Sequence, residues 1–105
     1  MHPEKTKRSD AGTAVATVLV MRLYVADSAP NSLKAIANLE AICKEYLQDN
    51  FELEIIDVLE FPQRALADGV LVTPSLAKVS PSPVAKIVGD LSDRSNVLQA
   101  LGITE

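Results

Sequence analysis

The fold is decided by residues 73–92, which read TPSLAKVSPSPVAKIVGDLS. Two short runs rich in apolar side chains, 75–79 and 84–88, flank a turn made only of serine and proline. Proline presets the backbone of a turn and serine bonds to nearby backbone groups, so this tetrapeptide separates two strands. The segment therefore predicts a β-hairpin.

An apolar run and an amphipathic helix precede the hairpin. Residues 18–25 are almost all apolar, which is typical of a strand covered on both faces. Residues 27–32 start a helix, with polar capping side chains and Pro30 in the first turn. The helix is expected to reach about Leu47, with an apolar stripe formed by Leu33, Ile36, Leu39, Ile42, Cys43, Tyr46 and Leu47.

Three further elements complete the prediction. Residues 51–58 alternate between apolar and acidic side chains, so they form a strand that is partly exposed on one face. A weak helix covers Gln63 to about Asp68 and ends at Gly69. After the hairpin, Ser92 caps a last helix that runs to Leu101. The order βαβαββα predicts an α/β domain of the thioredoxin-like class, with a right-handed crossover in its first half.

Composition limits the classes of protein. A chain of 105 residues with 48% hydrophobic residues makes one domain, which we place at 17–105, after a disordered leader at 1–16. The net charge of −4 disfavours nucleic-acid binding. The longest apolar stretch, 14–21, is too short to span a bilayer, and a single cysteine forms no internal disulfide. We expect a cytoplasmic protein with no membrane contact.

The sequence offers little for catalysis. Thioredoxin-like enzymes keep a reactive thiolate at the start of the first long helix, but residues 29–32 read APNS, and Cys43 is several turns further on. His2, the one histidine, makes a zinc site improbable, and the glycines form no phosphate-binding motif. The acids clustered at 49–60 suit a solvated or interacting surface better than a catalytic pair. We therefore expect no enzymatic activity, no metal and no cofactor.

Five short segments, in their order and spacing, resemble the KaiB family. They are Leu23-Tyr24-Val25-Ala26, Pro30-Asn31-Ser32, Ile56-Asp57-Val58-Leu59, Thr73-Pro74-Ser75-Leu76-Ala77-Lys78-Val79 and Gly89-Asp90-Leu91-Ser92. The resemblance covers about residues 18–101. It implies a regulator that binds the N-terminal ATPase ring of the KaiC ATPase, or of a KaiC homologue, and opposes its phosphorylation in a circadian clock or a related timing or stress pathway. In a cyanobacterial setting it also implies KaiA as a partner.

The same resemblance implies site residues. The KaiC-facing surface would lie within 57–69, with Asp57, Leu59, Pro62, Gln63 and Asp68 as partner-binding residues and Lys78 and Lys86 at cationic positions of the family. An alternative interpretation is that Asp57 and Asp68 cap local turns, that Pro62 starts a helix, and that both lysines are solvated strand residues. The two interpretations stay open at this point.

The resemblance further implies a second fold. KaiB proteins exchange the thioredoxin-like monomer with a ground fold of order βαββααβ, commonly a tetramer, and self-association to a dimer or tetramer follows from it. The residues expected to govern the exchange are Pro74, Pro81, Pro83, Gly89, Asp90, Ala100 and Gly102. Ala100 and Gly102 stand where cyanobacterial members tend to have glycine and aspartate, and both differences favour the thioredoxin-like helix.

The chain departs from the family pattern at Gly69, where members often carry lysine, and it lacks the acidic C-terminal tail of the cyanobacterial proteins. Two rival functions are a thiol oxidoreductase or peroxide-handling enzyme on the same fold, and a sensor-type or stress-response interaction module.

Overall fold

The computed structural model describes residues 18–48 and 50–103, so the predicted leader at 1–16 lies outside the described residues. The element order is βαβαββα, as predicted, with a short π-helical turn added to the first helix. The strands are β1 (Leu19–Val25), β2 (Phe51–Asp57), β3 (Ser75–Ser80) and β4 (Ala85–Val88). The helical elements are α1 (Pro30–Ile42), η1 (Cys43–Leu47), α2 (Pro62–Ala67) and α3 (Arg94–Leu101).

The four strands form one mixed sheet in the order β2-β1-β3-β4. β1 runs parallel to β2, with Tyr24 opposite Ile56, and antiparallel to β3, with Tyr24 opposite Ser75. β3 and β4 make the predicted hairpin. Because β1 has a partner on each side, every residue that projects from it is surrounded by side chains of neighbouring strands.

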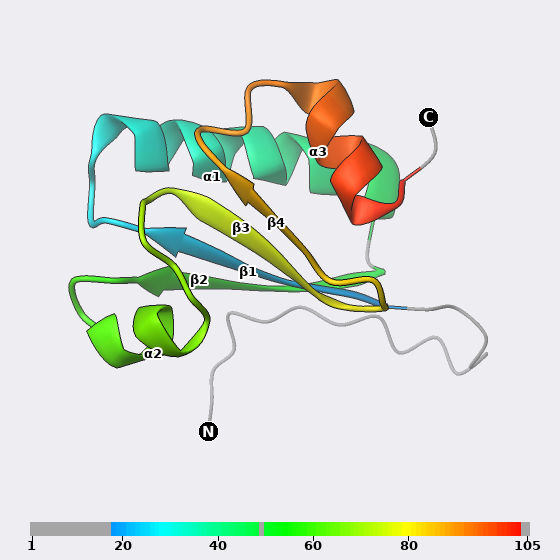
Figure 1. The fold of residues 1–105 in the computed structure, drawn as a ribbon. Helices are drawn as coiled ribbons and strands as arrows, with labels where there is room; N and C mark the ends of the chain where they lie inside the picture. The colour runs from blue at the N-terminus through cyan, green and yellow to red at the C-terminus, as the bar shows by residue number, and fades with distance from the viewer. Residues whose placement is uncertain (1–17, 49, 104–105) are drawn as a thin grey trace.

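The two faces of the sheet are covered unequally. α1 and α3 lie on one face, and α2 lies on the other near the ends of β1 and β2 (Figure 1). The main core fills the first face, where buried side chains of β1 such as Met21 and Leu23 meet Leu39 of α1 and Leu98 of α3. A smaller core of Tyr24, Ile56, Ala65 and Val70 lies under α2. Within residues 18–48 and 50–103, no helix other than α2 lies on the second face.

The stripe predicted for α1 is wrong at its first member, because Leu33 is 53% exposed whereas Ser32 and Ala35 are buried. Ser32 faces inward because its hydroxyl accepts a hydrogen bond from the backbone N–H of Ala26, at 3.0 Å. Ala29, and no polar side chain, occupies the N-cap position, while Pro30 in the first turn is confirmed. The helix reaches Leu47 as predicted, but its last turn is π-helical.

The last helix starts two residues later than predicted. Its cap is Asp93, whose carboxylate accepts a hydrogen bond from the N–H of Asn96 at 3.2 Å, so the prediction of Ser92 as the cap is wrong. Ser92 instead donates its backbone N–H to Asp90, at 3.0 Å. Gly102 ends the helix at φ 79°, the left-handed conformation predicted for it.

The residues predicted to govern a fold change lie around the hairpin and α3. The peptide bonds before Pro74, Pro81 and Pro83 are cis. Gly89 follows β4 at φ 120°, a conformation that L residues rarely adopt. Ala100 lies in the last turn of α3 and packs partly against the main core. The thioredoxin-like state is thus the one described, and exchange with a second fold stays a prediction.

Candidate functional site

The candidate site is the α2 segment, residues 57–72, which lies on the second face of the sheet. Its only helix, α2, has six residues and buries one side chain, Ala65. After α2, Val70 donates its N–H to the carbonyl of Ala65 at 2.8 Å, and the chain then continues toward the sheet. Such a short helix is barely stable alone, so its position depends on what it contacts.

Large apolar side chains of this segment point into solvent. We call them the apolar ridge: Leu59, Phe61, Leu66, Leu71 and Val72, all exposed. Leu59 and Leu66 are each 70% exposed and Leu71 is 87% exposed. Single exposed apolar residues are common, but a group of this size within 14 residues makes the segment a candidate interaction surface.

A buried tyrosine holds the end of α2 against the sheet. The hydroxyl of Tyr24 donates a hydrogen bond to Oδ2 of Asp68, the C-cap residue of α2. Arg22, two residues earlier on β1, donates to the same oxygen through Nη1 at 2.9 Å. Both bonds favour the charged carboxylate and lower the pKa of Asp68, with the Tyr24 bond the larger cause. Burial next to this carboxylate raises the pKa of Tyr24 to about 12.

Two further contacts fix the segment to the edge strands. Nζ of Lys86, on β4, donates to the carbonyl oxygens of Asp68 at 2.9 Å and Gly69 at 3.2 Å. Arg64, on α2, makes a two-bond contact with Glu54 of β2, at 2.6 and 2.8 Å. The Arg64 hydrogen bonds lower the pKa of Glu54. We call these six residues the anchor network: Arg22, Tyr24, Glu54, Arg64, Asp68 and Lys86.

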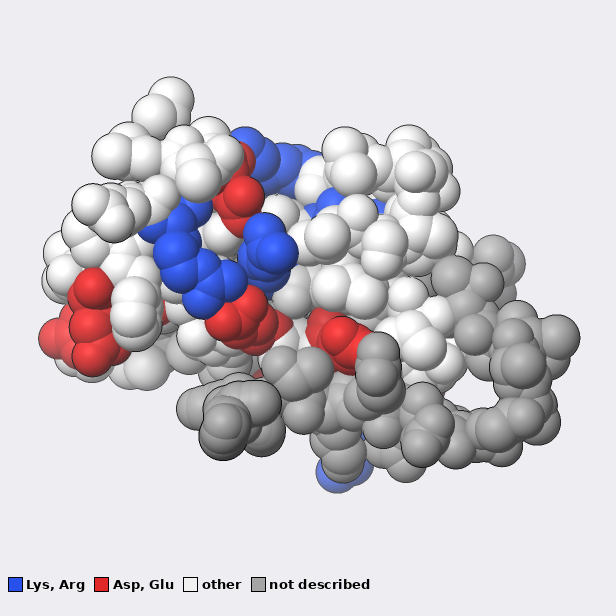
Figure 2. All heavy atoms as spheres, turned by 90° about the horizontal axis from the view of Figure 1, so that it is seen from below, with Lys and Arg blue, Asp and Glu red and all other residues white. Residues whose placement is uncertain are grey.

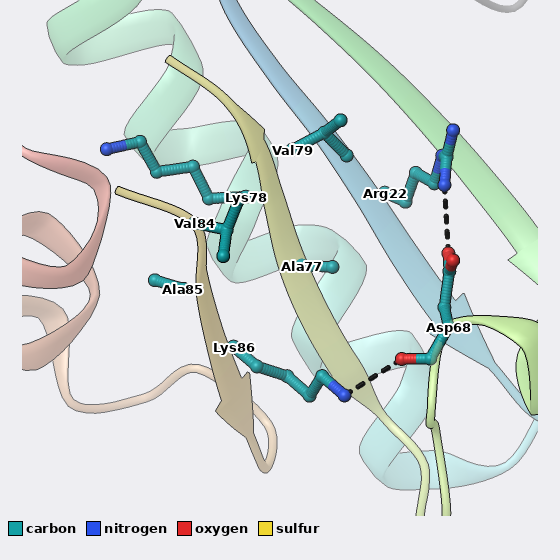
Figure 3. A pocket seen from close by; sticks show the side chains of 8 residues that line it. All are labelled: Arg22, Asp68, Ala77, Lys78, Val79, Val84, Ala85 and Lys86. Atoms are coloured by element: carbon teal, nitrogen blue, oxygen red, sulfur yellow. Dashed lines mark hydrogen bonds and ion pairs between the residues drawn. The ribbon is translucent and has the colours of Figure 1, made fainter. Parts of the chain in front are cut away.

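Next to α2 the sheet carries a shallow groove of about 450 Å³. Figure 3 shows Arg22, Asp68 and Lys86 around it, with the small side chain of Ala77 between Arg22 and Lys86 in the sheet register. Val79 and Val84 line it nearer the turn between β3 and β4. From the same side of the molecule, Figure 2 shows basic side chains gathered with acidic ones near the middle of the face. Two ion pairs on this face are Arg22–Asp68 at 2.9 Å and Arg64–Glu54 at 2.6 Å.

The structure brings most of the predicted site residues together but gives them different roles. Leu59, Pro62 and Gln63 lie exposed on the α2 segment. Asp57 supports the backbone, because its Oδ1 accepts N–H bonds from Leu59 at 2.9 Å and from Asp27 at 3.3 Å. Asp68 belongs to the anchor network. For both aspartates the structure thus favours the interpretation that they hold local structure.

Lys78 lies apart from this site. It stands opposite Met21 on the face that carries the main core, and it is only 6% exposed. A Cβ on Gly102 would lie 3.6 Å from its Nζ, so the ammonium group reaches the C-terminal end of α3. A cation is favourable there, where helix carbonyls point outward. The idea that Lys78 is a solvated strand lysine is wrong, and Figure 3 shows its side chain directed away from Lys86.

Thiol and metal chemistry find no support in this geometry. Cys43 is buried at the start of η1, and burial raises the pKa of its thiol to about 12, so the reactive thiolate is scarce at neutral pH. Within residues 18–48 and 50–103, no group of three or more His, Cys, Asp or Glu side chains is placed to hold a metal ion. In the same part of the chain, no helix is long and apolar enough to cross a membrane.

Sequence reasoning missed Phe61, Leu66, Leu71 and Val72 of the apolar ridge, and the roles of Arg22, Tyr24, Glu54 and Arg64. One signal was available for the ridge. Leu71 and Val72 look like the start of a strand, but Thr73-Pro74 follows at once. β3 starts only at Ser75, so these two apolar side chains lie outside the sheet. The anchor network joins residues up to 46 positions apart, so local pattern carries no trace of it.

Comparison with known proteins agrees with the fold and the resemblance. The KaiB domain model matches residues 22–103. The circadian clock oscillator protein KaiB of Microcystis aeruginosa is 51% identical over 84 residues, which are 80% of this chain and 81% of that protein. The circadian clock protein KaiB3 of a Synechocystis strain is 47% identical and covers 81% of this chain and 83% of its own.

Solved structures give the same fold class. The N-terminal domain of Synechococcus elongatus SasA superposes with a TM-score of 0.69 at 28% identity, covering 90% of this chain and 92% of that chain. Mitochondrial thioredoxin 3 of Saccharomyces cerevisiae reaches 0.67 at 15% identity, covering 82% and 78%, which shows a shared fold and nothing more. By its domain match and its identity to clock proteins over most of its length, this chain belongs to the KaiB family.

Proposed function

We propose that this protein is a binding regulator of a KaiC-type ATPase, which docks on the N-terminal ATPase ring of that partner and opposes its phosphorylation. The observation that carries the proposal is the apolar ridge, an exposed apolar surface on a segment that the sheet holds in place. Membership in a family of circadian clock proteins supports the choice of partner. KaiA binding and self-association stay predictions of the resemblance.

The contact is made mainly by apolar side chains. Asp57 and Asp68 already accept hydrogen bonds from the protein itself, whereas Leu59 and Leu71 have most of their surface in water. Burying one such leucine against a partner contributes about 1.5–3 kcal/mol. Two of them can therefore change the dissociation constant by about a hundredfold or more.

The experiment uses a double variant that combines Leu59→Ser and Leu71→Ser. Its binding is compared with that of a control variant, Leu33→Ser. Leu33 is an exposed leucine on α1, across the sheet from α2, and serves as the matched control. Binding to a hexameric KaiC homologue is measured by biolayer interferometry with and without ATP, and phosphorylation of the ring by gel shift. The double variant should lose binding and the control should keep it. Equal affinities in folded proteins would contradict the proposed surface.

A further inference from the structure

We propose that Tyr24 and Asp68 are positioning residues, which hold the α2 segment in its binding pose while the apolar ridge makes the contact. This inference rests on the proposed function and assigns different roles to two groups of residues in the same surface. The geometry that carries it is a set of polar contacts from three strands to one short helix.

The first step is that apolar burial alone fixes the segment weakly. α2 contributes only Ala65 to the smaller core; elsewhere in the segment Val70 is buried in it and Val58 packs partly against it. These small side chains bury little surface, while ordering the backbone of each residue opposes folding. Polar contacts must therefore supply much of what keeps this segment in one place.

The second step is that the polar contacts converge on the residue at the end of α2. Oδ2 of Asp68 accepts from both Tyr24 and Arg22 on the central strand, and the Asp68 carbonyl accepts from Lys86 on an edge strand. Tyr24 is fully buried, so its hydroxyl has a fixed position. Hydrogen bonds to a charged group contribute more to stability than neutral ones do.

The third step concerns what is left for a partner. Asp68 uses its carboxylate and its carbonyl within the protein, and Tyr24 is inaccessible. Leu66 and Leu71 stand on either side of Asp68 in sequence and are exposed. The hydroxyl of Ser75 also holds the chain beyond Leu71, by donating to the Val72 carbonyl at 2.6 Å. A ridge fixed in this way loses less conformational entropy when it binds.

The test separates positioning from contact by measuring two quantities on the full chain. Amide hydrogen exchange of residues 62–72 reports how firmly the segment is held, and biolayer interferometry reports affinity for the KaiC ring. Tyr24→Phe and Asp68→Asn should each raise exchange in this segment about tenfold and weaken binding about fivefold or more. Leu71→Ser should weaken binding at wild-type exchange. Tyr46→Phe, which changes the other tyrosine, should alter neither quantity.

A spectroscopic readout checks the contact itself. In a Tyr46→Phe background Tyr24 is the only tyrosine, and its ionisation is followed by absorbance near 295 nm. The pKa of Tyr24 is raised to about 12 first by burial and then by Asp68, so it should fall only in part when Asp68→Asn is added, because the burial stays. Should Asp68→Asn unfold the protein, Tyr24→Phe, which removes the same hydrogen bond from the other side, still tests the contact through exchange and binding.

Several outcomes would overturn the inference. If Tyr24→Phe kept wild-type exchange, Tyr24 would not hold the segment. If Tyr24→Phe raised exchange but kept wild-type affinity, the anchor network would not set the binding pose. Asp68→Asn with weaker binding and wild-type exchange would make Asp68 a contact residue. If the wild-type protein did not bind the ring at all, the proposed function would fail, and the exchange data would still decide whether Tyr24 and Asp68 hold the segment.

Discussion

We expect Ala100 and Gly102 to set the balance between the thioredoxin-like state and a second fold. Ala100 lies inside the last turn of α3, where glycine lowers stability by about 1 kcal/mol. Gly102 has φ 79°, where a residue with a Cβ loses about 1 kcal/mol or more. Ala100→Gly combined with Gly102→Ala should therefore destabilise this state by about 2 kcal/mol, or about thirtyfold in a two-state ratio.

Alanine at position 102 tests backbone strain alone, because it cannot form an ion pair with Lys78. A Cβ there meets Nζ of Lys78 at 3.6 Å, an ordinary contact, so alanine adds backbone strain without a clash. Aspartate at 102 would bring a carboxylate close to the Lys78 ammonium, and the ion pair would offset part of the strain. Gly102→Asp should therefore destabilise less than Gly102→Ala, and comparing them measures the contribution of Lys78.

The assay is backbone NMR together with urea unfolding. In the double variant we expect a second set of signals in which residues 97–102 have strand-type chemical shifts, and the wild type should show helical shifts alone. One set of helical signals in the double variant would refute the reasoning that these two positions hold the balance. An unfolding free energy within 0.5 kcal/mol of wild type would refute the strain argument itself, by comparison with the estimate of about 2 kcal/mol.

Two further predictions concern Cys43 and Glu54. Cys43→Ala should lower the free energy of unfolding by about 1 kcal/mol and leave binding to the KaiC ring unchanged, since the thiol only fills core space. If the wild type reduced insulin disulfides and the variant did not, Cys43 would have thiol chemistry. The pKa of Glu54 is lowered by Arg64, so its contribution to stability is complete above its ordinary pKa of about 4.5 and is lost as pH falls through the lowered value. Urea unfolding should show Glu54→Gln less stable than wild type at pH 7 and equal to it near pH 2, and a gap that does not narrow with falling pH would exclude the ion pair as its cause.

Much of the fold was accessible from the sequence because its signals are local. The serine-proline turn at 80–83 separates two runs that do pair as β3 and β4, and Gly102 adopts the left-handed cap expected of glycine after a helix. The prediction for Leu33 failed because helical spacing predicts roughly which face is apolar. Which residues at the border of that face are buried depends on tertiary contacts. Here the bond from Ala26 to Ser32 settles which residues of the first turn face inward.

The candidate site was less accessible for a different reason. The family pattern pointed to residues 57–69 as a partner-binding surface, and the structure shows a largely exposed segment there, but the roles of its acids depend on distant partners. Tyr24 and Asp68 are 44 residues apart, and their contact exists only because α2 folds back over β1. Charged residues are the ones that sequence reasoning favours for binding, so Leu66 and Leu71 were overlooked although Leu59 was predicted.

The placement of the site gives a physical reason for a thioredoxin-like fold without thioredoxin chemistry. β1 and β2 are parallel, so the loops after them, which lead to α1 and α2, lie at the same edge of the sheet. The N–H of Asp27 even donates to Asp57 across these two loops, at 3.3 Å.

Ligands of α/β proteins commonly bind at this edge, and thiol enzymes of this fold place their cysteine there. In this chain the start of α1 reads Pro30-Asn31-Ser32, with Ser32 turned inward, so no cysteine stands at the start of this helix. What this edge does expose is Leu59 and Phe61, at the entry to α2. The geometry that would present a thiolate to a substrate here exposes apolar surface, which suits the proposed contact with another protein.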